Sequence, residues 1–310
     1  MLDNLLSVTM VMADGRVTEA SNDSNPDLFW AVRGAGQCFG VAVDFLFQAH
    51  EIPNPVWAGV LGFPLSKVES VFQFGNEMVA TTNGDSAMVV QVGRYSWSNS
   101  QRDIGVMPIV FHRGNAESAK AVFQPLLDLQ PLINSTAEQS YNSVNHMLTP
   151  AAKRGGRNVS KGAAYTLPFR PEFIRESIVP ELEKLADVSG GTRSFLEFEF
   201  YKPDKWCEIP RSATAHGHRG QHQNVMIALY WQDAQDDVRM EEWSRQIADK
   251  VVAERFAHGR PPVGPVTEYG NYDHLSANPR HVFGENYTRL VDLKTKWDPS
   301  NVFNSWYSLV

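Results

Sequence analysis

The sequence predicts an α+β fold in which helices cover one face of an antiparallel sheet of about six or seven strands. Strand-like segments alternate apolar and polar side chains, most clearly at residues 195–200, and this alternation is typical of antiparallel strands with one buried face. Helix-like segments, such as residues 234–256, instead place apolar side chains along one stripe at helical spacing. The two patterns together favour an antiparallel sheet over a parallel one.

The predicted elements begin with a hairpin, because residues 5–13 form an apolar run that ends at the turn signal Asp14-Gly15 and residues 16–20 return. Further strands are predicted at residues 41–48, 57–63, 86–92, 106–111, 195–200 and 224–231. Helices are predicted to start near residues 66, 115, 171, 234 and 285. Asn115 is the expected N-cap of the second helix, and Pro180 is expected to interrupt the third.

Composition and charge exclude several kinds of partner. The chain has 310 residues and is 43% hydrophobic, which is enough for one large core or two smaller ones. Its 28 Lys and Arg against 35 Asp and Glu give a net charge of −7 with no basic block, which argues against nucleic acid or an anionic membrane as a partner. A small molecule is the expected partner, and no pattern specifies an oligomeric state.

The N-terminal residues show neither a basic region nor an apolar run of signal-peptide length, so the cytoplasm is the expected location. A chain that enters a hairpin at once is typical of one that has lost its beginning, and secretion would be expected if the natural start lies upstream. No apolar run is long enough to predict a membrane span. Two cysteines, Cys38 and Cys207, allow at most one disulfide.

The proline pair at Pro53 and Pro55 predicts a domain boundary between residues 1–52 and residues 53–266. Residues 267–310 form a third, C-terminal segment.

Residues 134–162 have little periodicity and are rich in Ser, Asn, Gly and Arg, which predicts a long loop. Long loops in compact enzymes tend to be lids or substrate contacts, so Tyr141 and His146 are candidates for lining a pocket. The alternative is that both are ordinary surface residues of the loop.

Three histidines, His216, His218 and His222, lie within seven residues. His-x-His spacing on a strand places two imidazoles on one face, as a metal site would require. No second cluster of Cys, Asp or Glu completes such a shell, so no metal site is predicted and a turn before the next strand is the alternative.

The C-terminal segment brings polar aromatic groups together. Tyr269 and Tyr272 are expected on an extended segment, and the following helix should present Asn286 and Tyr287 in its first turn. A phenol whose pKa is lowered can act as a base, and beside a flavin it could take a proton from a substrate hydroxyl. The alternative is that both tyrosines are core or interface aromatics with satisfied hydroxyls.

Three motifs in this segment resemble the C-terminal end of the FAD-linked oxidases of the berberine-bridge-enzyme-like group, whose flavin domain is of the PCMH type and whose fungal members act in secondary metabolism. They are Tyr-x-Asn-Tyr at 269–272, Gly-Glu-Asn-Tyr-x-Arg-Leu at 284–290 and Asp-Pro-x-Asn-x-Phe at 298–303. Residues 25–41 are similar to a glycine-rich block that closes the second flavin-binding subdomain in that family. Gln37 and Cys38 stand where the family usually has glycine and asparagine.

The resemblance implies an FAD cofactor and a role for each motif residue. Tyr272 would be the catalytic base with Tyr269 assisting. Cofactor contacts would come from Gly36, Phe39, Gly40, Asn271 and Asn286. For the three histidines the resemblance favours the turn, because the family carries an Arg-Gly turn before the same strand. The alternative is that His218 lies with Tyr141 and His146 in the substrate pocket. The family's upstream half, which carries the flavin-attachment residues, is absent from this sequence. Residues 1–52 would then be a remnant of the FAD-binding subdomain, residues 53–266 the substrate domain, and residues 267–310 a return to the FAD-binding side.

Two functions follow as hypotheses. The first is an FAD-linked oxidoreductase of secondary metabolism that transfers hydride from a substrate C–H/O–H group to flavin. The alternative is a flavin-free family member that uses the substrate pocket as a non-redox cyclase of the pericyclase or Diels–Alderase type, where positioning alone supplies acceleration. A truncated product without activity is the third option.

Overall fold

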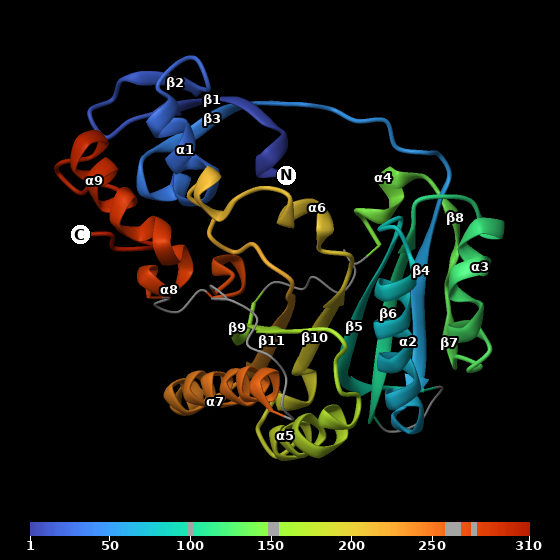
Figure 1. Cartoon of the computed structure of the whole chain (residues 1–310). Coiled ribbons are helices and arrows are strands. Elements are labelled where there is room, and N and C mark those ends of the chain that lie inside the picture. Colours follow the sequence, from blue (N-terminus) through green and yellow to red (C-terminus); the bar gives the residue numbers. More distant parts are fainter. Residues whose placement is uncertain (98–101, 148–154, 258–267, 274–277) are drawn as a thin grey trace. The chain divides into compact units, whose positions relative to one another are not determined.

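The computed structural model describes residues 1–97, 102–147, 155–257, 268–273 and 278–310. The chain forms two compact units, which are described separately below and drawn in Figure 1. Unit 1 consists of Met1–Glu51, Asp204–Gly220 and Gly264–Val310. Unit 2 consists of Ile52–Pro203 and Gln221–Val263. Among the described residues, no helix combines the length and the apolar character needed to cross a membrane.

Unit 1 contains a three-stranded antiparallel sheet in the order β2-β1-β3. Its strands are β1 (Leu5–Val11), β2 (Val17–Ser21) and β3 (Val41–Phe47). The predicted hairpin is confirmed: β1 and β2 pair, and Gly15 in the turn between them has φ of 82°, a conformation that glycine adopts without strain.

Unit 1 includes the helices α1 (Pro26–Ala35), α6 (Asp204–Cys207), α8 (Pro279–Phe283) and α9 (Tyr287–Trp297). Apolar side chains of α1, α8 and α9 pack with those of β1 in one core, whereas α6 has no buried residue. Phe29 of α1, Met10 of β1 and Leu290 of α9 are buried in one hydrophobic core. Pro26 occupies the first turn of α1, where a missing N–H costs no helical hydrogen bond.

Unit 2 is built on an antiparallel sheet of eight strands. The strand order is β7-β4-β6-β5-β10-β11-β9, and β8 also pairs with β4. The strands are β4 (Val56–Pro64), β5 (Ser86–Tyr95), β6 (Asp103–His112), β7 (Ile133–Asn134), β8 (Ala137–Gln139), β9 (Arg157–Tyr165), β10 (Phe195–Phe200) and β11 (Gln223–Trp231).

Helices pack on one face of this sheet, as predicted (Figure 1). They include α2 (Val68–Thr81), α3 (Ala116–Leu127), α5 (Val179–Leu185) and α7 (Asp237–Phe256), and the short α4 (Tyr141–Val144) lies near β4. Phe72 of α2 meets Phe198 and Phe200 of β10 edge to face at 5.2 and 5.7 Å. Alternate residues of β10 therefore supply the core, which confirms the α+β class.

Two local predictions need correction. The long loop is predicted to extend to residue 162, but residues 157–162 belong to β9, which pairs with β11 along its whole length. Its polar and glycine residues hid the strand, because a strand at a sheet edge needs fewer buried side chains. The helix expected over 171–188 is a π-helical turn, Ile174–Ile178, followed by α5, and Pro180 lies in the first turn of α5.

The two units and the three predicted segments divide the chain at similar points, near residue 52 and near residue 265. They differ at residues 204–220, which the sequence places in the middle segment and the structure places in unit 1. This difference arises because residues 204–220 form hydrogen bonds with α1 and with the start of α9. The candidate site depends on these hydrogen bonds.

Candidate functional site

Residues 204–220 are attached to the end of α1 by backbone hydrogen bonds. The N–H of Ala215 donates to the carbonyl of Trp30, and the N–H of His216 donates to the carbonyl of Arg33, each at 3.1 Å. Gly34 has φ of 140°, and a Cβ at this position would collide with the backbone of His216. Only glycine permits this close approach. The glycine-rich block therefore brings two parts of the chain into contact.

Two buried side chains complete the attachment. The amide of Asn286 donates to the carbonyls of Arg211 and Thr214 at 2.9 and 3.0 Å. The guanidinium of Arg219 binds both carboxylate oxygens of Asp3 at 2.6 and 3.0 Å, and its side chain is only 3% exposed. The residues between these anchors, His216 and His218 among them, are therefore held at both ends.

His216 and His218 meet Tyr269 and Tyr272, and these four residues are named here the phenol–imidazole cluster. The ring of His218 stacks on Tyr269 with centroids 5.3 Å apart and an interplanar angle of 27°. Tyr272 meets Tyr269 edge to face at 5.0 Å, and His216 does so at 6.4 Å. The amide of Asn271 donates to the Tyr269 hydroxyl at 2.9 Å. Tyr269 is thus the centre of the cluster.

A tight turn brings the two phenols together. Gly270–Tyr272 form a 3-10 turn in which the N–H of Tyr272 donates to the carbonyl of Tyr269 at 3.0 Å. The extended segment expected here is therefore wrong. Gly270 allows the turn to lie against the core, because a Cβ at this position would overlap the hydroxyl of Tyr307.

The imidazole of His216 is electrically neutral near pH 7. Burial, together with the neighbouring His218 and Arg219, lowers its pKa to about 4, and Asp3 only partly opposes the shift. A neutral imidazole donates one hydrogen bond and accepts another. The cluster therefore presents phenol and imidazole groups that can hold or pass a proton.

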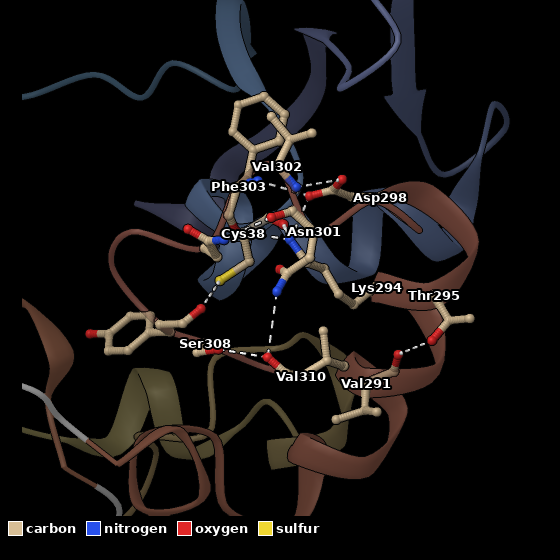
Figure 2. A network of polar contacts seen from close by, with 12 residues as sticks. Cys38, Val291, Lys294, Thr295, Asp298, Asn301, Val302, Phe303, Ser308 and Val310 are labelled. Atoms are coloured by element: carbon tan, nitrogen blue, oxygen red, sulfur yellow. Dashed lines mark hydrogen bonds and ion pairs between the residues drawn. The ribbon is translucent and has the colours of Figure 1, made fainter.

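A second network, centred on the fully buried side chains of Lys294 and Asp298, fixes the glycine-rich block to the C-terminus (Figure 2). The Lys294 ammonium donates to the carbonyls of Cys38 and Phe303 at 2.8 Å each and pairs with Asp298 at 2.6 Å. Burial alone would raise the pKa of the Asp298 carboxyl, but hydrogen bonds from Lys294 and from the amides of Phe303 and Val302 lower it overall.

The thiol of Cys38 belongs to the same network and is not a reactive group. Burial raises its pKa to about 12, against a smaller opposing effect of Lys294. Both Cys38 and Cys207 are free thiols in the structure. Neither the Lys294 network nor His216 was predicted from sequence. For Lys294 the available signal was its place four residues before Asp298, a helical ion-pair spacing.

The C-terminal part of the chain matches a protein-family model. Residues 268–308 match the family described as berberine and berberine like. The FAD-linked oxidoreductase pgmH of Aspergillus terreus is 29% identical over 327 residues, covering 99% of this chain and 65% of the relative. The chain is therefore similar to the berberine-like proteins, with the family model matching its C-terminal part.

Solved structures share the fold of this chain. The 6-hydroxy-D-nicotine oxidase of Arthrobacter nicotinovorans is 24% identical, with a TM-score of 0.74 over 100% of this chain and 66% of that one. Berberine bridge enzyme from Eschscholzia californica is 17% identical, with a TM-score of 0.77 over 99% of this chain and 66% of that one. The chain thus spans about 65% of the length of the curated relative quoted above.

Some of the predicted site residues lie together, and others are buried in the core. Tyr269, Tyr272 and His218 meet in the phenol–imidazole cluster, and Asn271 donates a hydrogen bond to the Tyr269 hydroxyl. The Phe39 side chain is fully buried, and the α-carbon of Gly40 is packed so closely on β1 that an added Cβ would lie 2.6 Å from the carbonyl oxygen of Val11. The Asn286 amide is bound to backbone carbonyls. Gly36 is partly exposed and could lie against a ligand.

Two predicted pocket residues belong to unit 2. Tyr141 begins α4, is 42% exposed and meets Phe111 of β6 edge to face at 6.2 Å. His146 follows α4 and is exposed, with its N–H donating to the carbonyl of Ser143 at 3.0 Å. Their role in a substrate pocket stays a prediction. Within the described parts of the chain, no three His, Cys, Asp or Glu residues lie close enough to bind a metal ion.

Proposed function

We propose that this chain provides the substrate-oxidising part of an FAD-dependent oxidoreductase of small-molecule secondary metabolism. The observation that carries the proposal is the phenol–imidazole cluster, in which two phenols and a neutral imidazole meet beside the family's C-terminal motifs. The relative quoted above bears the name of an FAD-linked oxidoreductase, which supports the same reaction class. In this proposal unit 1 is the FAD-binding side and unit 2 is the substrate domain.

The groups of unit 1 that can contact a flavin are backbone atoms and phenols rather than buried side chains. Phe39 and Gly40 are enclosed by the protein, so the accessible part of the glycine-rich block is the backbone at Gly36 and Gln37. Lys294 holds the carbonyl of Cys38 and thereby keeps this backbone in one conformation. When bound, FAD would supply the hydride acceptor.

The proton would be handled by the chain's own side chains. Tyr272 is partly exposed. As its phenolate it would take the proton of a substrate hydroxyl and become the neutral phenol, while hydride leaves the carbon that bears the hydroxyl for the flavin. Tyr269 assists by fixing the Tyr272 ring through their edge-to-face contact, and Asn271 fixes the Tyr269 hydroxyl. The substrate class this chemistry suits is a small molecule with an oxidisable hydroxyl group.

The test is flavin-dependent turnover of hydroxyl-bearing substrates by the wild type and by Tyr272→Phe. Loss of a general base should lower turnover by about 100-fold or more. Tyr230→Phe, which alters a phenol on β11 of unit 2, is the matched control and should leave turnover unchanged. Equal turnover in Tyr272→Phe would overturn its role as base. Equal product formation without FAD would contradict the proposal and would support the flavin-free cyclase instead.

A further inference from the structure

The two imidazoles of the cluster are carried by an arm that is anchored on both sides. On one side the N–H of His216 donates to the carbonyl of Arg33 at 3.1 Å. On the other side Arg219, the residue after His218, forms its bidentate pair with Asp3. The rings of His216 and His218 lie 6.2 Å apart. A chain segment fixed in this way can impose the position of whatever its side chains contact.

What these side chains contact is Tyr269. His218 stacks on the face of the Tyr269 ring, and the His216 ring lies nearly perpendicular to it with centroids 6.4 Å apart. The hydroxyl of Tyr269 accepts the hydrogen bond of Asn271, and its ring meets Tyr272. Offset stacking and edge-to-face contacts of this kind restrict ring rotation, because each loses favourable contact when the ring turns.

We propose that His218 and His216 are positioning residues that hold the Tyr269 phenol, and through it fix the orientation of Tyr272. This inference rests on the proposed function, because positioning has a catalytic consequence only if Tyr272 handles the substrate proton. His218, which stacks on the ring with centroids 5.3 Å apart, has the larger effect, and His216, whose ring centroid lies 6.4 Å away, has the smaller one.

The arrangement can be tested without turnover, by nitrating the folded chain with tetranitromethane and measuring each tyrosine by peptide mass spectrometry. His218→Ala uncovers the Tyr269 ring and should raise its nitration rate severalfold, whereas His218→Phe retains a ring in place and should not. His216→Ala should give a smaller increase. Exposed Tyr141 in unit 2 is the internal reference, and His50→Ala, which removes an exposed imidazole, is the matched control.

Turnover measures the catalytic consequence. In His218→Ala we expect kcat to fall by about tenfold or more, since misplacing a reacting group is costly. His218→Phe should restore most of kcat, and FAD affinity should be the same in both variants. An unchanged nitration rate of Tyr269 in His218→Ala overturns the inference. So does a raised nitration rate with an unchanged kcat. A wild type without flavin-dependent turnover refutes the proposed function instead, and nitration alone then decides whether the histidines hold Tyr269.

Discussion

The Lys294 ammonium and the Asp298 carboxylate form an ion pair at 2.6 Å with both side chains fully buried. Each group has further partners, because Lys294 also binds two carbonyls and Asp298 accepts from the amides of Val302 and Phe303 (Figure 2). A charge that is buried this completely is tolerated only while its partners remain.

Removing one partner should therefore be costly. Lys294→Met leaves the Asp298 carboxylate buried without its cation, and we expect the free energy of unfolding to fall by about 3–5 kcal/mol. Urea unfolding followed by circular dichroism measures the change. Lys296→Met, which removes a neighbouring exposed lysine paired with Asp27, is the control and should cost less than about 1 kcal/mol. Equal losses in the two variants would contradict the assigned importance of the buried pair.

Gly34 offers a test of how residues 204–220 are attached. Gly34→Ala would place a Cβ against the backbone of His216 and force alanine into a left-handed conformation, so we expect a loss of about 2 kcal/mol or more. Gly36→Ala is the matched control, because Gly36 has φ of −54° and its added Cβ would meet nothing closer than 3.6 Å. Thermal unfolding of both variants distinguishes them, and an unaffected Gly34→Ala would show that the close approach is not required.

The lowered pKa of His216 predicts how the free energy of unfolding depends on pH. Its pKa in the folded chain is about 4, below its ordinary value of 6.5, so between these values the unfolded chain binds a proton that the folded chain does not. The stability that neutral His216 contributes is complete above pH 6.5 and is lost as pH falls towards 4. The full shift corresponds to about 3 kcal/mol at most.

The comparison that isolates this effect is the difference in unfolding free energy between wild type and His216→Gln across that pH range. Glutamine keeps a polar side chain but does not titrate, so the wild type should lose more stability than the variant on acidification. Parallel pH curves would contradict a depressed pKa for His216.

The sequence was sufficient to predict the elements whose signal is local. The alternation at residues 195–200 predicts β10, the Asp14-Gly15 turn predicts the first hairpin, and Asn115 caps α3 by accepting the N–H of Ser118. The three C-terminal motifs resemble those of the berberine-bridge-enzyme-like group, and this resemblance identifies Tyr269 and Tyr272 as candidate site residues from sequence alone.

The parts that could not be predicted depend on contacts between distant residues. The strand β9 has a polar sequence and exists because β11 pairs with it. Residues 204–220 join unit 1 through Asn286 and the Arg219–Asp3 pair, partners 70 or more positions away. A local pattern carries no record of such contacts, so the role of His216 in the candidate site was missed, as was the burial of Phe39.

The most direct test of the proposed FAD-dependent function is whether the purified chain binds FAD. The chain would be incubated with FAD, separated from free cofactor by gel filtration, and its absorbance recorded through the near-ultraviolet and visible range. Flavin absorption bands that elute with the protein are the expected result. A spectrum that stays flat after added FAD would contradict an FAD-dependent oxidoreductase formed by this chain and would favour the flavin-free alternative.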